Sequence, residues 1–144
     1  MKLYHYAFKK EILSEGIEGF HKHNDTKIIN NLISNEFNGE CFGRDYCIFF
    51  NLDKRDDGYL TVSVDSSKLD SNLLFVANQN IANLIYKKWY KGNDTSEAVK
   101  EYVSSIKKLS EYNNEYENPE VFYLDDISPD LLHLEEIDEG CFEE

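Results

Sequence analysis

Three short segments, far apart in the chain, have the composition of β-strands, and each has a polar residue set into it. They contain Leu3-Tyr4-His5-Tyr6, Cys47-Ile48-Phe49-Phe50-Asn51 and Pro119-Glu120-Val121-Phe122-Tyr123. Aromatic and β-branched residues favour the pleated, half-buried surface of a sheet. A histidine and a glutamate within apolar strands are costly to bury unless each has a partner. His5 and Glu120 are therefore the first candidates for functional residues.

Apolar residues at helical spacing occupy the regions between these segments. They predict helices over residues 8–15, after a cap at Asp25, over residues 78–91 and over residues 95–109. Gly16 is expected to end the first of these helices. Trp89 lies on the apolar stripe of the third helix and is predicted to be a core residue.

Further strands are predicted at residues 59–64, 73–76, 120–124 and 132–137. Residues 46–52 form an almost continuous apolar run, which predicts a central strand covered on both faces. The charged segment 53–58 ends in glycine and predicts a β-hairpin between this run and residues 59–64. Strands at both ends of the chain with helices between them are typical of an α+β fold, and a single domain is expected over residues 1–144.

Charge is unevenly distributed along the chain, which has a formal net charge of −13. Residues 111–144 contain 13 acidic residues and no Lys or Arg, whereas residues 1–110 contain 15 residues of each sign. This acidic C-terminal region is either a solvated surface or an anionic surface for a basic protein partner. Because the chain has no broad basic stretch, direct nucleic-acid binding is not expected.

Several classes of protein are excluded by what the sequence lacks. No apolar run approaches the ~20 residues of a membrane span, and no apolar leader is present, so no membrane association is expected. Cys41, Cys47 and Cys141 lack CxxC spacing and are expected to be reduced thiols, which indicates a cytoplasmic protein. The segment His21-Lys22-His23 has alternate histidines, but no neighbouring ligand completes a metal-binding spacing, so no metal site is predicted.

The three strand segments and their surroundings form an ordered set of motifs. The first continues into Ile12-Leu13-Ser14-Glu15-Gly16-Ile17, and the third into Ile127-Ser128-Pro129-Asp130-Leu131. This order resembles the ADP-ribosyltransferase superfamily of the His-Tyr-Glu type, with DarT-like and PARP-like members, and the similarity spans nearly the whole chain. The resemblance implies an ADP-ribosyltransferase-like split β-sheet core with short helices between the strands.

The resemblance also implies a role for each motif residue in a reaction that uses NAD as a substrate. Glu120 would be catalytic, because cleavage of the nicotinamide–ribose bond develops positive charge that a carboxylate stabilises. His5 would bind the adenosine-side ribose, and backbone groups at Tyr6 would bind the nicotinamide amide. Phe49 would stack on the nicotinamide ring. Arg44 would meet the pyrophosphate, or else form a salt bridge with Asp45 or another neighbour.

The middle and first motifs depart from the family pattern at three positions. Ala7 replaces the usual Thr or Ser, Cys47 replaces Gly, and Phe49 lacks the hydroxyl of the usual Tyr. The sequence therefore supports two hypotheses. The first is an NAD-dependent ADP-ribosyltransferase-like enzyme with an unknown acceptor. The second is a catalytically degenerate acidic interaction or inhibitor protein, of a phage or mobile-element type, that binds a basic partner site or an ADP-ribose-like nucleotide.

Overall fold

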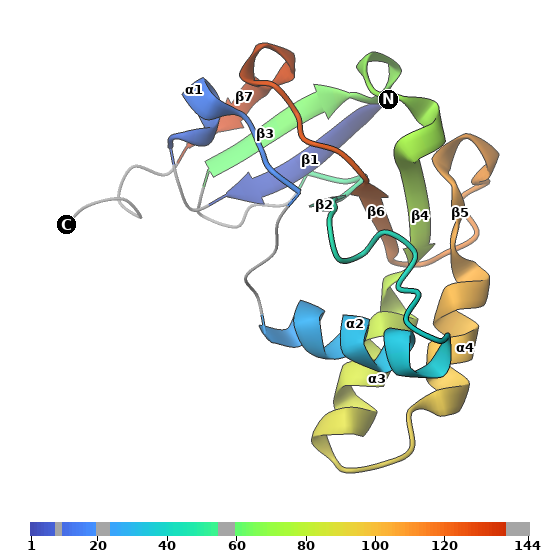
Figure 1. Cartoon of the computed structure of the whole chain (residues 1–144). Coiled ribbons are helices and arrows are strands. Elements are labelled where there is room, and N and C mark those ends of the chain that lie inside the picture. The colour runs from blue at the N-terminus through green and yellow to red at the C-terminus, as the bar shows by residue number, and fades with distance from the viewer. Residues whose placement is uncertain (8–9, 20–23, 55–59, 138–144) are drawn as a thin grey trace.

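The computed structural model describes residues 1–7, 10–19, 24–54 and 60–137. This part of the chain has the predicted α+β fold, with four α-helices and two antiparallel sheets (Figure 1). Three of the helices gather on one side of the molecule, and the smaller sheet lies on the other. The larger sheet lies between them.

The smaller sheet has three strands in the order β1-β3-β7. These are β1 (Lys2–Ala7), β3 (Leu60–Asp65) and β7 (His133–Glu136). β1 pairs with β3 along its whole length, and β3 pairs with β7 across an irregularity between Thr61 and Val62. The strands predicted at both ends of the chain are thus confirmed, and they belong to one sheet.

The larger sheet has four strands in the order β2-β6-β4-β5. These are β2 (Ile48–Phe50), β6 (Pro119–Tyr123), β4 (Leu74–Asn78) and β5 (Lys107–Lys108). Beyond β2, the backbones of Asn51 and Tyr4 exchange two hydrogen bonds, of 2.9 and 2.8 Å. This bridge joins the two sheets at β1 and β2.

The α-helices are α1 (Ile12–Glu15), α2 (Asn24–Glu36), α3 (Gln79–Tyr90) and α4 (Ser96–Ser105). Short 3₁₀ turns occupy Ser66–Lys68, Ser71–Leu73, Leu109–Glu111 and Pro129–Leu131. The last predicted helix ends at Ser105 rather than at Leu109, because residues 107–108 pair with β4 as a strand. No helix in the described ranges combines the length and the apolar character needed to cross a lipid bilayer.

The period-two alternation of β6 divides the interior into two cores. Val121 and Tyr123 face the core between the sheets, whereas Phe122 belongs to the core beneath α2, α3 and α4. Neighbouring side chains along a strand point to opposite faces. Glu120 therefore projects to the same side as Phe122, toward the helices. This orientation places a carboxylate between the larger sheet and the helical layer.

Three sequence predictions about packing are wrong. β2 lies at an edge of its sheet rather than at its centre, and it pairs with β6 rather than forming a hairpin with β3. The hairpin signal is local, whereas β3 pairs fully with β1 and leaves β2 to a distant partner. Trp89 is 42% exposed, because the last turn of α3 extends beyond the buried Ala82 and Ile85. Part of the predicted turn, residues 55–59, lies outside the described residues.

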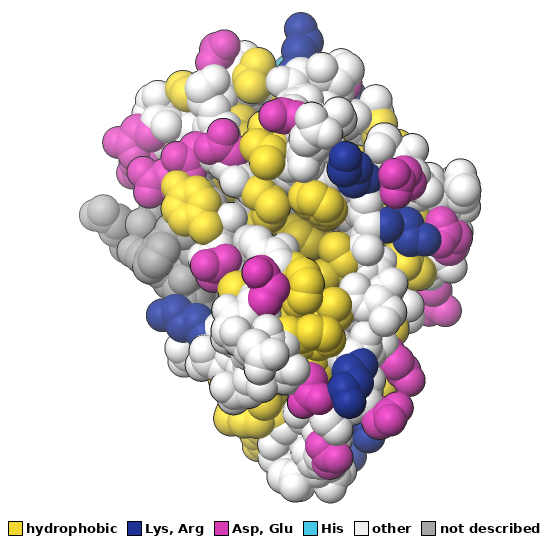
Figure 2. Space-filling view, turned by 45° about the vertical axis from the view of Figure 1, so that its right-hand side comes forward, with side chains coloured by type: hydrophobic (Ala, Val, Ile, Leu, Met, Phe, Trp, Pro, Cys, Tyr) yellow, Lys and Arg dark blue, Asp and Glu magenta, His cyan; other side chains and the backbone are white. Residues whose placement is uncertain are grey.

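Acidic residues of the C-terminal region are partners for basic residues elsewhere in the fold. Glu115, Glu135 and Glu136 form ion pairs with Lys107, Lys2 and Lys54. On the face shown in Figure 2, several acidic side chains lie beside Lys or Arg. Part of the charge excess that the sequence places in residues 111–144 is therefore balanced within the described part of the chain.

Gly16 connects α1 to a bridge between Ile17 and Ile127, whose backbones exchange hydrogen bonds of 2.9 and 2.8 Å. Gly16 has a φ of 84°, in the region that favours glycine, and a Cβ there would lie 2.2 Å from the Ile127 carbonyl oxygen. The glycine is thus required both for its backbone conformation and for the close approach of residue 127.

Gly16→Ala is expected to destabilise the protein more than Gly39→Ala, its matched control. Gly39 also has a positive φ, of 93°, but a Cβ there would meet no atom within 4 Å. In the control, the strain of a left-handed alanine should lower the free energy of unfolding by about 1 kcal/mol. In Gly16→Ala, steric overlap should lower it by a further ~1–3 kcal/mol. Urea unfolding of both variants measures the difference, and equal losses would contradict the tight approach of residue 127.

Candidate functional site

A pocket of about 350 Å³ opens between the larger sheet and helices α2 and α3. One face of α3 forms a wall of polar and aromatic side chains, Gln79, Asn83 and Tyr86. The pocket also contains Arg44, Phe49 and Glu120, three of the five residues predicted from the sequence. Its volume is near the lower end of the range of about 300–1,000 Å³ found for small-molecule sites.

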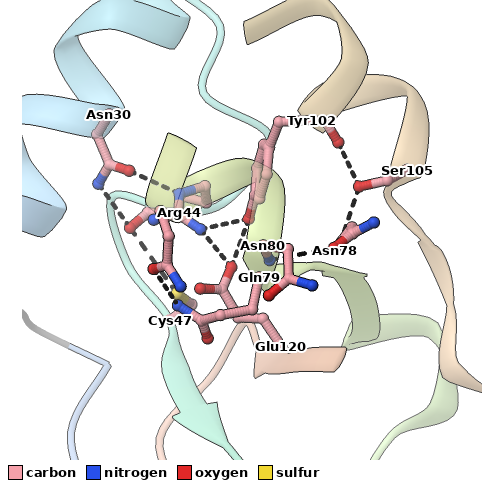
Figure 3. Close-up of polar contacts among 10 residues, drawn as sticks. Asn30, Arg44, Cys47, Asn78, Gln79, Asn80, Tyr102, Ser105 and Glu120 are labelled. Atoms are coloured by element: carbon pink, nitrogen blue, oxygen red, sulfur yellow. Dashed lines mark hydrogen bonds and ion pairs between the residues drawn. The ribbon is translucent and has the colours of Figure 1, made fainter. Parts of the chain in front are cut away.

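Glu120 is held in this pocket by two hydrogen bonds to one of its carboxylate oxygens. Arg44 Nη1 donates to Oε1 at 2.6 Å, and the Tyr102 hydroxyl donates to the same atom at 2.5 Å (Figure 3). The Arg44 and Glu120 side chains are nearly buried, with residue exposures of 2% and 6%. A buried ion pair with hydrogen-bonded oxygens is far less costly than either charge alone.

Arg44 is fixed on several sides in the loop before β2. Its Nε donates to Asn30 Oδ1 at 2.8 Å, and Asn30 Nδ2 donates back to the Arg44 carbonyl at 2.9 Å. The guanidinium carbon lies 5.0 Å from the ring centres of both Phe49 and Tyr102. Burial is the largest single influence on the pKa of Arg44 and lowers it, but the charge of Glu120, its hydrogen bond, and the neighbouring Tyr102 and Cys47 together raise the pKa above its ordinary value. Arg44 is therefore a permanent internal cation.

Tyr102 links the ion pair to the start of α3. Burial, followed by the charge of Glu120, raises the pKa of Tyr102 well above its ordinary value, so its hydroxyl remains a donor. The Tyr102 carbonyl accepts a hydrogen bond from Ser105 Oγ at 2.6 Å, and Ser105 Oγ accepts the Asn78 N–H at 3.0 Å (Figure 3). Asn78 in turn caps α3 by accepting the Asn80 N–H.

The second oxygen of Glu120 is available to a ligand. Both of the hydrogen bonds that Glu120 accepts end on Oε1. In the described part of the chain, no fully buried side-chain nitrogen or oxygen lacks a partner. Oε2 is therefore not fully buried, and it belongs to a side chain that lines the pocket. A carboxylate oxygen in this position accepts hydrogen bonds from ligand hydroxyl or amide groups.

His5 and Tyr6 are not brought into the pocket wall. His5 lies next to it: its Nδ1 is 2.9 Å from the Phe49 carbonyl oxygen, and its ring meets Phe50 edge-on at 5.8 Å. Burial lowers the pKa of His5, so a neutral ring donates through Nδ1 to that carbonyl. The Tyr6 hydroxyl donates to the Asp53 carbonyl at 3.3 Å. His5 thus supports the strand that carries Phe49.

The cysteine and histidine residues that the structure describes give no sign of a nucleophile or a metal centre. Burial raises the pKa of Cys47 to about 12, which leaves its thiol protonated. Among the residues that the structure describes, no cluster of three or more His, Cys, Asp or Glu is arranged to hold a metal ion. The His21-Lys22-His23 segment lies outside these residues.

Sequence reasoning did not identify several residues of the site. Tyr102 falls on the apolar stripe of the helix predicted over residues 95–109, and such a position indicates only a core residue. The available signal was its hydroxyl, because a buried tyrosine usually needs a hydrogen-bond partner. Asp25, expected only as a helix cap, lines the pocket, as do Gln79 and Asn83. Their polar spacing on α3 resembles that of any solvated helix face.

Comparison of the chain with protein-family models, curated proteins and solved structures gives no match. The geometry defines a small polar pocket with a fixed carboxylate, an internal cation and aromatic side chains.

The Arg44–Glu120 pair should behave as one energetic unit. Arg44→Met or Glu120→Gln each leaves a buried charge without its counter-charge, and each is expected to lower the free energy of unfolding by about 3–5 kcal/mol. The double variant removes both charges, so its loss should fall short of the sum of the single losses by about 2 kcal/mol. Denaturant unfolding of the four proteins completes the cycle; additive losses would show that the pair is not coupled.

Protonation of His5 should weaken the folded state in acid. Its folded pKa lies below the unfolded value of about 6.5, so the unfolded chain binds the proton first. Stability should therefore fall as the pH decreases through about 6.5 toward the folded pKa, by at most about 1.4 kcal/mol per pH unit from this group. His5→Gln should show a shallower decline between pH 7 and 5, measured by urea unfolding. An unchanged slope would contradict the assignment.

Proposed function

We propose that this protein is an ADP-ribosyltransferase-like enzyme that uses NAD and transfers ADP-ribose to an acceptor. The observation that carries the proposal is the convergence of Arg44 and Phe49, from the segment around β2, with Glu120, from the distant β6, on one pocket. His5, from a third segment, is hydrogen-bonded to the backbone of Phe49. The ADP-ribosyltransferase-like split-sheet core belongs to the proposal, and two sheets that meet at the Tyr4–Asn51 bridge support it.

The chemistry assigned to Glu120 is stabilisation of positive charge. In the proposed reaction the bond between the nicotinamide nitrogen and ribose C1′ breaks, and its electron pair leaves with nicotinamide. The acceptor atom then bonds to C1′ and releases its proton to solvent. Glu120 Oε2 would bind a ribose hydroxyl and stabilise the oxocarbenium-like state. Because Arg44 and Tyr102 hold Oε1, the carboxylate needs no reorganisation during the reaction.

Phe49 is assigned to contact with the nicotinamide ring. The Arg44 guanidinium already lies against this ring at 5.0 Å, so a ligand would use the part of Phe49 that borders the pocket. A cytoplasmic location, where NAD is available and thiols stay reduced, is part of the proposal.

One observation favours a second candidate, a protein that binds an ADP-ribose-like nucleotide without turnover. Arg44 offsets the negative charge of Glu120, which weakens the electrostatic stabilisation that catalysis requires. In the inhibitor form of this candidate, a basic partner would meet residues 111–144. The ion pairs of Glu115, Glu135 and Glu136 leave less free charge there than the sequence suggests.

Nicotinamide release from NAD, followed by chromatography, tests the proposal together with calorimetric titration of NAD. The wild type should bind NAD and release nicotinamide, and Glu120→Gln should reduce release by about 100-fold or more. Asp126→Asn is the matched control, because it makes the same chemical change at a carboxylate outside the pocket. Circular dichroism at the assay temperature verifies that both variants are folded.

The outcomes separate the two candidates. Saturable NAD binding without nicotinamide release would favour the binding protein over the transferase. Equal release by the wild type and Glu120→Gln would remove Glu120 from the mechanism. Absence of both binding and release at millimolar NAD would reject the proposed function.

A further inference from the structure

Among the residues that the structure describes, the lining of the pocket has no spare positive charge for the phosphates of a dinucleotide. Its described lining residues include three charged side chains, Asp25, Arg44 and Glu120. Arg44 and Glu120 neutralise each other at 2.6 Å, so the remaining formal charge is that of Asp25. A pyrophosphate placed here would lack a counter-charge. With a volume of about 350 Å³, the pocket is also at the small end for ligand sites.

Beyond the pocket, α3 continues into a segment whose aromatic and basic side chains are exposed to solvent. Gln79, Asn83 and Tyr86 line the pocket, and Tyr90 follows Tyr86 at the next interval of four residues. Residues on an α-helix three or four positions apart share a face. In Figure 1, α3 runs from the larger sheet toward the lower end of the molecule, so this face leads out of the pocket.

Aromatic side chains at this end of α3 are exposed to solvent. Trp89 is 42% exposed and Tyr90 is 77% exposed. The Trp89 ring lies 5.7 Å from that of Tyr86, at an interplanar angle of 41°. Tyr86 thus borders both the pocket and the exposed aromatic group. Large aromatic faces in solvent are a platform on which a planar base stacks.

Lysines interleave with these aromatic residues, in the sequence Tyr86-Lys87-Lys88-Trp89-Tyr90-Lys91. Lys87 and Lys91 are exposed, and in the described part of the chain neither forms a salt bridge within 4.0 Å. Lys88 lies near the carboxylate of Asp94. Lys87 and Lys91, four residues apart, therefore present two unbalanced positive charges on the side of α3 that Tyr90 shares with Lys87, in a chain with a net charge of −13.

We infer that the end of α3, residues 86–91, is a second subsite that binds the adenosine and pyrophosphate half of NAD. The adenine ring stacks on Trp89, and Lys87 and Lys91, beyond Tyr90 around the same end of α3, meet the phosphates. The pocket then holds only the nicotinamide–ribose half. This inference rests on the proposed function and deepens it, because it assigns the pyrophosphate to α3 rather than to Arg44.

Trp89 is the only tryptophan in the chain, so its fluorescence reports directly on this subsite. With excitation at the red edge of tryptophan absorption, NAD, ADP-ribose and ADP should each quench the emission saturably. Nicotinamide riboside, which lacks adenine and pyrophosphate, should leave it unchanged. Loss of stacking in Trp89→Ala should weaken NAD binding about 5- to 100-fold, and Trp89→Phe should restore most of it.

Charge variants test the phosphate contacts. Lys87→Ala and Lys91→Ala should each weaken ADP binding about two- to fivefold, with the effect diminishing at high salt. Lys100→Ala is the matched control, because it removes the same charge from the neighbouring α4, where Lys100 pairs with Glu36. An equal effect of the control would contradict a local phosphate site.

Different results would contradict the α3 subsite and the proposed enzyme activity. If NAD binds calorimetrically but neither quenches Trp89 nor depends on it, the subsite is wrong and the proposed function stands. If ADP quenches Trp89 and NAD releases no nicotinamide, the subsite stands and the enzyme does not. A single-stranded oligonucleotide that displaces ADP at much lower concentration than NAD would overturn the assignment to a dinucleotide.

Discussion

The buried ion pair between Arg44 and Glu120 is the interaction on which the arrangement of the site depends. It connects the loop before β2 with β6, and through Asn30 and Tyr102 it also fixes α2 and α4. Charges in such a position are tolerated only when every partner is in place. The same bonds that stabilise the pair also hold in place the Glu120 carboxylate, which lines the pocket, so the stability and the geometry of the site have one origin.

Local patterns predicted most of the elements, because strand alternation and helical spacing are properties of short segments. Phe49 and Glu120 could also be identified as candidate site residues from the sequence, because both belong to recognisable strand motifs. The partner of β2 was not, because pairing between distant strands leaves no local signal. The role of Tyr102 could not be predicted for a similar reason. Its position on the apolar stripe of a helix predicts that the side chain is buried, but not which group its hydroxyl contacts.

Helix α3 gives the site two environments along one face. Close to the sheet, amide side chains and Tyr86 border a pocket whose principal charges cancel. One turn farther out, aromatic and basic side chains stand in solvent. A rigid helix keeps the two environments at a constant separation, about 1.5 Å for each residue between them. The cap at Asn78 and its link through Ser105 fix where this spacing begins.

The position of β6 between β2 and β4 has a consequence for synthesis of the chain on the ribosome. All three helices of the helical layer, both neighbouring strands and Arg44 are made before residue 119 emerges. Until then β2 and β4 each present an unpaired edge, and such edges invite association with other chains. The larger sheet and the charge balance of Arg44 are completed by the same late strand. A nascent chain that stalls before β6 is therefore a natural target for chaperones or proteases.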